Sequence, residues 1–476
     1  MGKKFQPYVD IMQPTNEVTG SFNLCVVKLP TTTVKFIVDC GMYQEPKYEE
    51  QNNSFKVNPE SVDFAILTHN HVDHNGRFPF FVRSGFRGNI YTTKVTQRIV
   101  GKALFDNLKV LKSVNKYNKT AKTLYNETDV ATTLSLMIGC DYNKPIEVND
   151  YVRLHFVMNG HIFGAASVLV EIHHPGVDNI YIFVTGDYNN KNTFFFVPPI
   201  RKWMTKLPMT LIIESTYAYM ESSEITWVFR ENIAKAIEQG KTIVVPAYSL
   251  GRAQEVLWTL RDMQEENQIS YDIPIYYDGK LSSFYTDMVM RMQQSGLLHF
   301  FPEKRDFQPE FLQRVKGYKK RKKILQDSNA KIIVTSSGNG SYGAAQSYIK
   351  QFIQSPKALI HFTGYCPEGT LGYNLKTTPD EEIVWVSGAK VVKRADVQFT
   401  NEFSAHAKAD ELIDFLKQFE NLKLVLVTHG TTENKSLFAD RIVKEVDCNE
   451  VGILGEEYFY RVNSYGLDKA VPTKFR

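Results

Sequence analysis

The apolar positions of the chain follow two patterns that change at about residue 211. Before that point, short apolar runs read as separate strands, and each ends in a polar residue, at 34–39, 63–68 and 181–187. Such runs predict buried strands whose ends carry loops suited to chemistry. The stretch 103–150 is richer in Asn, Lys and Thr, with a helical piece at 127–137, and reads as an excursion outside the first domain.

After residue 211, β-branched apolar runs alternate with segments of helical periodicity. The expected strands are 211–215, 242–246, 273–277, 331–335 and 358–362. The expected helices between them are 227–239, 252–265, 281–292 and 344–353. Strand–helix–strand alternation with buried strands predicts a mostly parallel sheet covered by helices, and hence a second α/β domain.

The earlier style returns after about Arg394, with a strand at 422–427 and a helix at 434–446. The simplest organisation is a first domain that is interrupted by a second and completed by the C-terminal stretch. This predicts domain segments at 1–212, 213–394 and 395–476.

Composition narrows the class of protein. No apolar run approaches the ~18 residues that a membrane span needs, so we expect no membrane association. The five cysteines are scattered without a CxxC pair, which favours a reducing cytoplasm over a disulfide framework. The net charge is only +4. One basic run, 319–323, reads first as solvated surface, and contact with a phosphate backbone is the alternative.

The strongest chemical signal follows the strand at 63–68. Within six residues the chain places three histidines and an aspartate: His69, His71, Asp73 and His74. Imidazole and carboxylate groups suit zinc, with ligand distances of about 2.0–2.2 Å. Alternating ligands in one loop can serve two metals, and a single zinc rarely needs four such close ligands. Because only 11 of 476 residues are histidine, chance clustering is a poor explanation.

Three further candidates follow other strands or glycine-rich turns. His161 lies among small residues, Asp187 follows an apolar strand and a glycine, and His429 follows the strand at 422–427. Each alone reads as an ordinary strand-end residue, but the cluster at 69–74 favours ligand roles for all three. By contrast, we expect structural or exposed roles for His155, His173, His174, His299 and His361.

Taken in order, these residues resemble a known family over nearly the whole chain. The chain resembles the metallo-β-lactamase fold at its four successive motifs, with Asp39, the His69–His74 run, His161 and Asp187 in that order. Motifs A, B and C of its β-CASP nucleic-acid-processing branch resemble Glu214, His406 and His429. The resemblance implies an αββα metallo-β-lactamase sandwich interrupted by a β-CASP α/β domain.

The resemblance also implies roles for these residues. One zinc would be held by His69, His71 and His161, the other by Asp73, His74 and His429, and Asp187 would bridge the two Zn²⁺ ions. Asp39 would steady the ligand loop from behind. His406 is the candidate general acid, held and kept charged by Glu214.

The implied activity is a ribonuclease that hydrolyses single-stranded RNA and leaves 5′-phosphate and 3′-OH ends. A histidine at motif C is typical of RNA-processing members of the family. An inserted domain of this size is expected to leave access to the metal site for one unpaired strand. The alternatives are a thioesterase or lactonase on the same metal core and a catalytically silent scaffold. Internal versus 5′-to-3′ cutting stays open, as does a homodimer.

Overall fold

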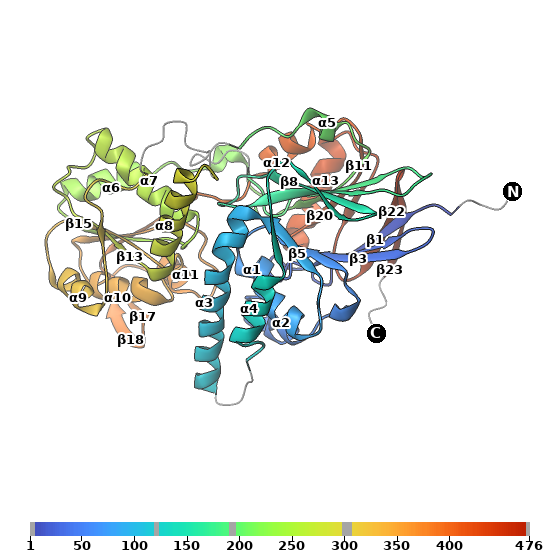
Figure 1. Ribbon diagram of the computed structural model, residues 1–476. Coiled ribbons are helices and arrows are strands. Elements are labelled where there is room, and N and C mark those ends of the chain that lie inside the picture. The colour runs from blue at the N-terminus through green and yellow to red at the C-terminus, as the bar shows by residue number, and fades with distance from the viewer. Residues whose placement is uncertain (1–4, 119–122, 190–196, 298–306, 473–476) are drawn as a thin grey trace. The chain divides into compact units, whose positions relative to one another are not determined.

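The computed structural model describes residues 5–118, 123–189, 197–297 and 307–472 (Figure 1). The chain forms two compact units. The first comprises the described residues of Met1–Asn192, Val197–Ser222 and His406–Arg476, and the second comprises those of Ser223–Ala405. Among the described residues, no helix has the length and apolar character needed to cross a membrane.

The first unit is built on two sheets. One has eight strands in the spatial order β23 (Gly466–Pro472), β22 (Tyr458–Asn463), β1 (Tyr8–Met12), β2 (Asn23–Lys28), β3 (Thr33–Val38), β4 (Phe64–Ile66), β5 (Asn89–Thr93) and β6 (Met137–Cys140). The other has seven strands in the order β21 (Val451–Ile453), β20 (Leu422–Thr428), β11 (Met209–Glu214), β10 (Ile180–Val184), β9 (Ala166–Ile172), β8 (Val152–Met158) and β7 (Pro145–Asn149).

Alternating side chains explain how these two sheets pack. In β3, Phe36 and Val38 enter a core shared with the second sheet, whereas Ile37 faces the opposite side. A period of two places successive side chains on opposite faces of a strand. Both faces of β3 are therefore buried, which is why the strand reads as a continuous apolar run.

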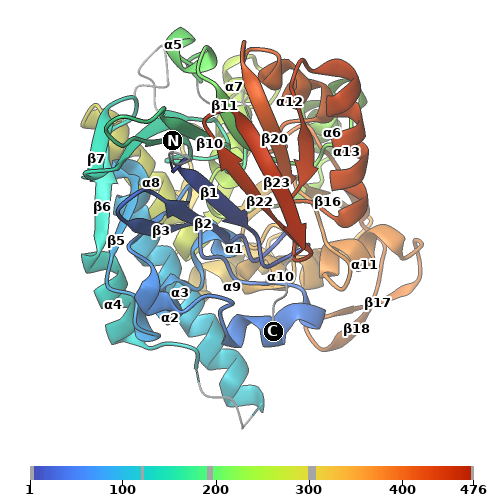
Figure 2. The same cartoon turned by 90° about the vertical axis from the view of Figure 1, so that its right-hand side faces the viewer.

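Helices cover the outer faces of the two sheets, which gives the helix–sheet–sheet–helix layers that the family resemblance implied (Figures 1 and 2). The eight-stranded sheet packs on α2 (Phe78–Arg83), α3 (Lys94–Asn118) and α4 (Glu127–Ser135). The seven-stranded sheet packs on α12 (Ala409–Leu416) and α13 (Thr432–Glu445).

The stretch 103–150 is more integral to this unit than its composition suggested. Its first part continues α3, a helix of 25 residues, whose Leu104 and Leu108 are buried against the eight-stranded sheet. The segment then supplies β6 to one sheet and β7 to the other. The interpretation as an outside excursion was therefore wrong, because an apolar stripe on α3 anchors it in the core.

The second unit contains a six-stranded sheet whose strands are all parallel. The spatial order is β14 (Gln313–Arg314), β13 (Ile275–Asp278), β15 (Lys331–Thr335), β12 (Thr242–Pro246), β16 (Ala358–Phe362) and β19 (Asp396–Phe399). One face packs on α6 (Phe229–Glu238) and α7 (Arg252–Glu265). The other packs on α9 (Tyr318–Gln326), α10 (Gly343–Phe352), α11 (Leu371–Thr377) and the hairpin β17 (Ile383–Val386) to β18 (Ala389–Val392).

α8 (Lys280–Gln294) follows β13 and completes the strand–helix alternation of this unit. β12 shows why the alternation predicts buried strands, because Val244 packs on one face of the sheet while Ile243 and Val245 pack on the other. The mostly parallel α/β sheet expected from the sequence is confirmed.

Candidate metal centre

The candidate ligands come from loops and turns at the carboxyl ends of strands in the first unit. His69 follows β4, His161 follows β8, Asp187 follows β10 and His429 follows β20. Five of the seven candidate ligands are buried, and the other two, His71 and Asp73, are half-buried. Residues more than 350 positions apart in the chain thus meet at one place, as the sequence pattern required.

Asp73 and His74 lie in a single helical turn, α1 (Val72–Asn75), within the segment that the sequence predicted to be a loop. A backbone hydrogen bond fixes the position of this turn, because the Cys40 amide donates to the His74 carbonyl at 2.8 Å. A Cβ on Gly41 would lie 1.5 Å from the carbonyl oxygen of Asp73. Sequence reasoning missed Gly41, whose place two residues after Asp39 at a strand end was the available signal.

A first set of ligand atoms is formed by three histidines and one carboxylate oxygen. The Nδ1 atom of His71 lies 3.1 Å from Nε2 of both His69 and His161. The Oδ2 atom of Asp187 lies 3.5 Å from the Nε2 atoms of the same two histidines, His69 and His161.

A second set lies on the other side of Asp187. The Nε2 atoms of His74 and His429 are 3.0 Å apart, and they lie 3.2 and 3.4 Å from Oδ1 of Asp187. An oxygen of Asp73 lies 3.9 Å from each of these nitrogens. Asp187 therefore turns one oxygen toward each set.

The geometry of both sets fits a bound divalent cation. Two ligands of a tetrahedral zinc at about 2.0–2.1 Å are separated by roughly 3.3 Å, close to the 3.0–3.1 Å between the facing imidazole nitrogens. Oδ1 of Asp187 is buried and accepts no hydrogen bond from the described residues. A buried carboxylate oxygen left in this state costs free energy unless a cation takes its charge.

In both ligand sets, histidine rings are oriented by hydrogen bonds at the ring nitrogen that does not face the other ligands. Asp39 accepts from Nδ1 of His74 at 2.7 Å, and this bond directs the Nε2 atom of His74 toward the second set. The Thr68 hydroxyl lies 3.0 Å from Nδ1 of His69. Such partners fix the tautomer and ring orientation of a metal-ligating histidine.

Thr216 plays the same part for His429, whose Nδ1 lies 2.9 Å from the Thr216 hydroxyl. Neither Thr68 nor Thr216 was singled out from the sequence. Thr68 stands beside His69 and could have been found, whereas Thr216 follows a different strand and its contact depends on the pairing of β11 with β20.

The electrostatics of the site match this arrangement. Burial lowers the pKa of His71 to about 4, so its imidazole is neutral at pH 7, the form that binds a metal. Burial opposes a proton on His74, yet the carboxylates of Asp187 and Asp39 outweigh it and raise the pKa of His74 well above its usual value. A proton on His74 thus sits where a bound cation would replace it.

Glu214 and His406 form a pair beside the first set. Glu214 is the last residue of β11 and accepts from Nδ1 of His406 at 2.8 Å. The Nε2 atom of His406 lies 3.9 Å from Oδ2 of Asp187. Burial works against the charged imidazole, but the Glu214 carboxylate outweighs burial and raises the pKa of His406.

The remaining histidines lie elsewhere. His155 is buried on β8 near Trp203, and His361 is buried on β16, where Asn232 donates to its Nε2 at 3.1 Å. The expectation of structural roles fits both of these contacts. His299 lies outside the described residues.

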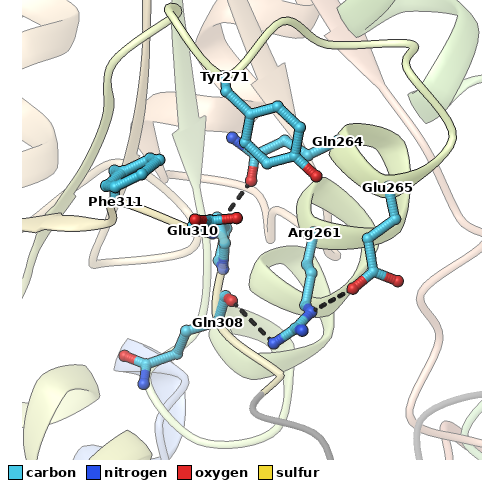
Figure 3. Close-up of a pocket in the computed structure, with 8 residues that line it drawn as sticks. Arg261, Gln264, Glu265, Tyr271, Gln308, Glu310 and Phe311 are labelled. Atoms are coloured by element: carbon cyan, nitrogen blue, oxygen red, sulfur yellow. Dashed lines mark hydrogen bonds and ion pairs between the residues drawn. The ribbon is translucent and has the colours of Figure 1, made fainter.

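A pocket of about 330 Å³ in the second unit offers different chemistry (Figure 3). Its lining contains no histidine or cysteine, and the Arg261 guanidinium donates to Glu265 at 2.9 Å and to the Gln308 carbonyl at 3.4 Å. The lining residues are Arg261, Gln264, Glu265, Tyr271, Gln308, Pro309, Glu310 and Phe311. We assign the metal chemistry to the first unit.

Three family models match successive parts of the chain. The metallo-beta-lactamase superfamily matches residues 24–185, the Beta-Casp domain matches 253–375, and the Zn-dependent metallo-hydrolase RNA specificity domain matches 390–452. The third match contains both His406 and His429.

The chain is also similar to curated proteins over most of its length. A ribonuclease of Thermus thermophilus is 28% identical over 429 residues, which is 88% of this chain and 91% of the relative. The transcription termination factor FttA of Methanosarcina mazei is 26% identical, covering 84% of this chain and 64% of the relative. For cleavage and polyadenylation specificity factor 73 of Drosophila melanogaster, the figures are 26%, 87% and 59%. The chain therefore spans less than two thirds of the length of the last two.

Proposed function

The chain belongs to the metallo-β-lactamase superfamily and to its β-CASP nuclease branch, and from this premise we propose that it hydrolyses single-stranded RNA with two zinc ions. The observation that carries the proposal is the placement of Asp187 between two sets of ligands. One oxygen faces His69, His71 and His161, and the other faces Asp73, His74 and His429.

These side chains would hold one ion in each set, with Asp187 shared. When bound, a pair of such ions supplies a water nucleophile at neutral pH and neutralises charge on a phosphodiester. The chain's own contribution is rigidity. Asp39, Thr68 and Thr216 hold three of the imidazoles through hydrogen bonds of 2.7–3.0 Å, so little reorganisation is needed when substrate arrives.

His406 would donate the proton that the leaving group needs. Its Nδ1 is committed to Glu214, while its Nε2 lies on the side of Asp187 and the ligands. A charged imidazole there can protonate the ribose 3′-oxygen as the P–O bond breaks. The upstream fragment then ends in 3′-OH and the downstream fragment keeps the 5′-phosphate.

The choice of RNA rests on three supports. The RNA specificity domain match covers His406 and His429, a relative that aligns over 91% of its length is a ribonuclease, and a histidine occupies the motif C position. The alternative is a small-molecule hydrolase, such as a thioesterase or lactonase, on the same metal core. The inserted Beta-Casp domain argues against it, because a compact hydrolase needs no insertion of this size.

A substrate panel separates the two functions. The zinc-loaded full chain is incubated with 5′-labelled and 3′-labelled single-stranded RNA, duplex RNA, DNA and a thioester, with His406→Gln as a matched control. We expect cleavage of single-stranded RNA to 5′-phosphate and 3′-OH ends by the wild type, and little by the variant. Thioester hydrolysis without RNA cleavage would favour the alternative.

The same time courses decide between internal and 5′-to-3′ cutting.

The five cysteines are free, which fits a reducing compartment, and we place the enzyme in the cytoplasm. A homodimer stays a prediction.

A further inference from the structure

The basic run at 319–323 lies on α9, at the margin of the second unit (Figure 1), and its members have two different roles. Arg321 turns inward, and its Nε and Nη2 donate to the two oxygens of the buried Asp278 at 2.7 and 3.0 Å. The Tyr348 hydroxyl donates to the same carboxylate at 2.9 Å. Arg321 is therefore a structural residue that fixes α9 to the end of β13.

Three of the run's four lysines face away from the protein, whereas Lys320 is half-buried and donates to the Arg314 carbonyl at 3.1 Å. Lys319, Lys322 and Lys323 are exposed, and their spacing of three and four residues places them on one stripe of the helix. Lys316, which precedes the helix, is exposed as well. Within the described part of the chain, none of these four ammonium groups lies within ion-pair distance of a carboxylate. The stripe is thus a concentrated positive charge that no carboxylate of the described residues neutralises.

This arrangement works against the stability of α9. Like charges three and four residues apart on a helix repel one another. A lysine in the first turn also opposes the positive end of the helix dipole, and no acidic residue of the first turn compensates. A merely solvated face would gain from interspersed acids, as is usual for exposed helices. A bound polyanion would relieve both penalties.

The stripe begins at the edge of the sheet where ligands of open α/β folds bind. Asp278, the partner of Arg321, ends β13, and the amide of Val315 donates to the carbonyl of Tyr277 on the same strand. The first turn of α9 therefore lies at the carboxyl edge of the parallel sheet. Loops from this edge also carry Tyr342 and Tyr365, which are 71% and 63% exposed, and such rings can stack on unpaired bases.

We infer that the lysine stripe, defined as Lys316, Lys319, Lys322 and Lys323, binds the phosphate backbone of single-stranded RNA. The stripe belongs to the unit that does not contain the metal-ligand cluster, so it acts as an anchor for substrate and takes no part in bond breaking. This inference rests on the proposed function and adds a binding surface to it.

The test measures RNA binding as a function of salt in the full chain. The triple variant K319Q/K322Q/K323Q is compared with K357Q/K444Q/K469Q, which removes the same charge from exposed lysines elsewhere. Fluorescence anisotropy with a labelled single-stranded RNA gives Kd at several salt concentrations. Each lost phosphate contact lowers the slope of log K against log salt by about 0.7 for a single strand.

We expect the stripe variant to lose roughly 2 from that slope and to bind about 10- to 100-fold more weakly near ~0.1 M salt. Its thermal midpoint should equal or exceed that of the wild type, and K319R/K322R/K323R should restore binding. Equal slopes for the stripe and control variants would overturn the inference and leave the ribonuclease proposal intact, with a solvated face or an acidic protein partner as the explanation. A wild-type protein that binds no RNA would overturn both.

Discussion

Asp39 offers the sharpest test of how the second ligand set is built. Its carboxylate accepts three buried hydrogen bonds, from the Thr68 amide at 2.8 Å, the Thr68 hydroxyl at 2.9 Å and Nδ1 of His74 at 2.7 Å. Its backbone has a φ of 65°, a conformation that Asn adopts as readily as Asp. Asp39→Asn therefore removes the charge without adding backbone strain.

The hydrogen bonds set the expected magnitude. A bond to a charged acceptor contributes about 1.5–3 kcal/mol, and a neutral amide acceptor retains roughly half of it. A loss of about 1.4 kcal/mol in the orientation of His74 corresponds to a tenfold loss of affinity. Because only His74 among the ligands contacts Asp39 directly, we expect about 10- to 100-fold weaker binding of one zinc equivalent and little change in the other.

The measurement is a competition titration with a chromophoric chelator, with zinc per chain determined by mass spectrometry after dialysis. Asp63→Asn is the matched control, since the Asp63 carboxylate accepts from the Lys35 amide at 2.7 Å and is exposed. Two equivalents of wild-type affinity in Asp39→Asn, or equal weakening of both, would refute the reasoning.

Three further predictions concern His406, Asp187 and His361. His406→Gln should retain both zinc equivalents while kcat falls about 10²- to 10⁴-fold, and loss of metal would reassign His406 as a ligand. Asp187→Ala should lose metal and cleavage together, so full zinc occupancy in this variant would contradict the bridging role. Burial lowers the folded-state pKa of His361 to about 4, below its unfolded value of about 6.5. Its contribution to stability is therefore complete above pH ~6.5 and is lost, by up to about 3 kcal/mol, as pH falls toward 4. The urea midpoint should follow this fall in the wild type and less steeply in His361→Gln, and parallel curves would count against it.

Much of the second unit could be predicted from the sequence. The strands at 242–246, 331–335 and 358–362 have the expected bounds, because both faces of a parallel strand are buried and the apolar run ends where the strand ends. The segment 103–150 was harder. Its Asn, Lys and Thr content suggested an excursion outside the first domain, although a stripe that includes Leu104 and Leu108 packs on the sheet.

Contacts between distant segments could not be read from local patterns. β1 pairs with β22, so that Val9 lies opposite Val462, and no periodicity in either strand specifies the other as its partner. The unit boundaries show the same limit. β11, which ends at Glu214, pairs in the first unit, although the second domain was expected to begin at 213. β19, which begins at Asp396, pairs in the second unit, although that domain was expected to end at 394.

At the candidate site, residue type and place at strand ends were sufficient to select the candidate ligands, which the structure brings together. The groups that orient them were not found, apart from Asp39 and Glu214. A hydroxyl such as that of Thr216 reaches His429 only because two strands that lie more than 200 residues apart are neighbours in one sheet. Spatial adjacency of this kind is a property of the folded sheet and has no local signature in the sequence.

The central claim is that two divalent cations at this cluster enable the chain to hydrolyse RNA. The most direct test adds zinc stepwise to chelator-treated protein and records bound metal and cleavage of end-labelled single-stranded RNA in the same samples. We predict negligible cleavage without metal and a rate that rises to its plateau as the second equivalent binds. Undiminished RNA cleavage by protein shown to be free of metal would contradict the account.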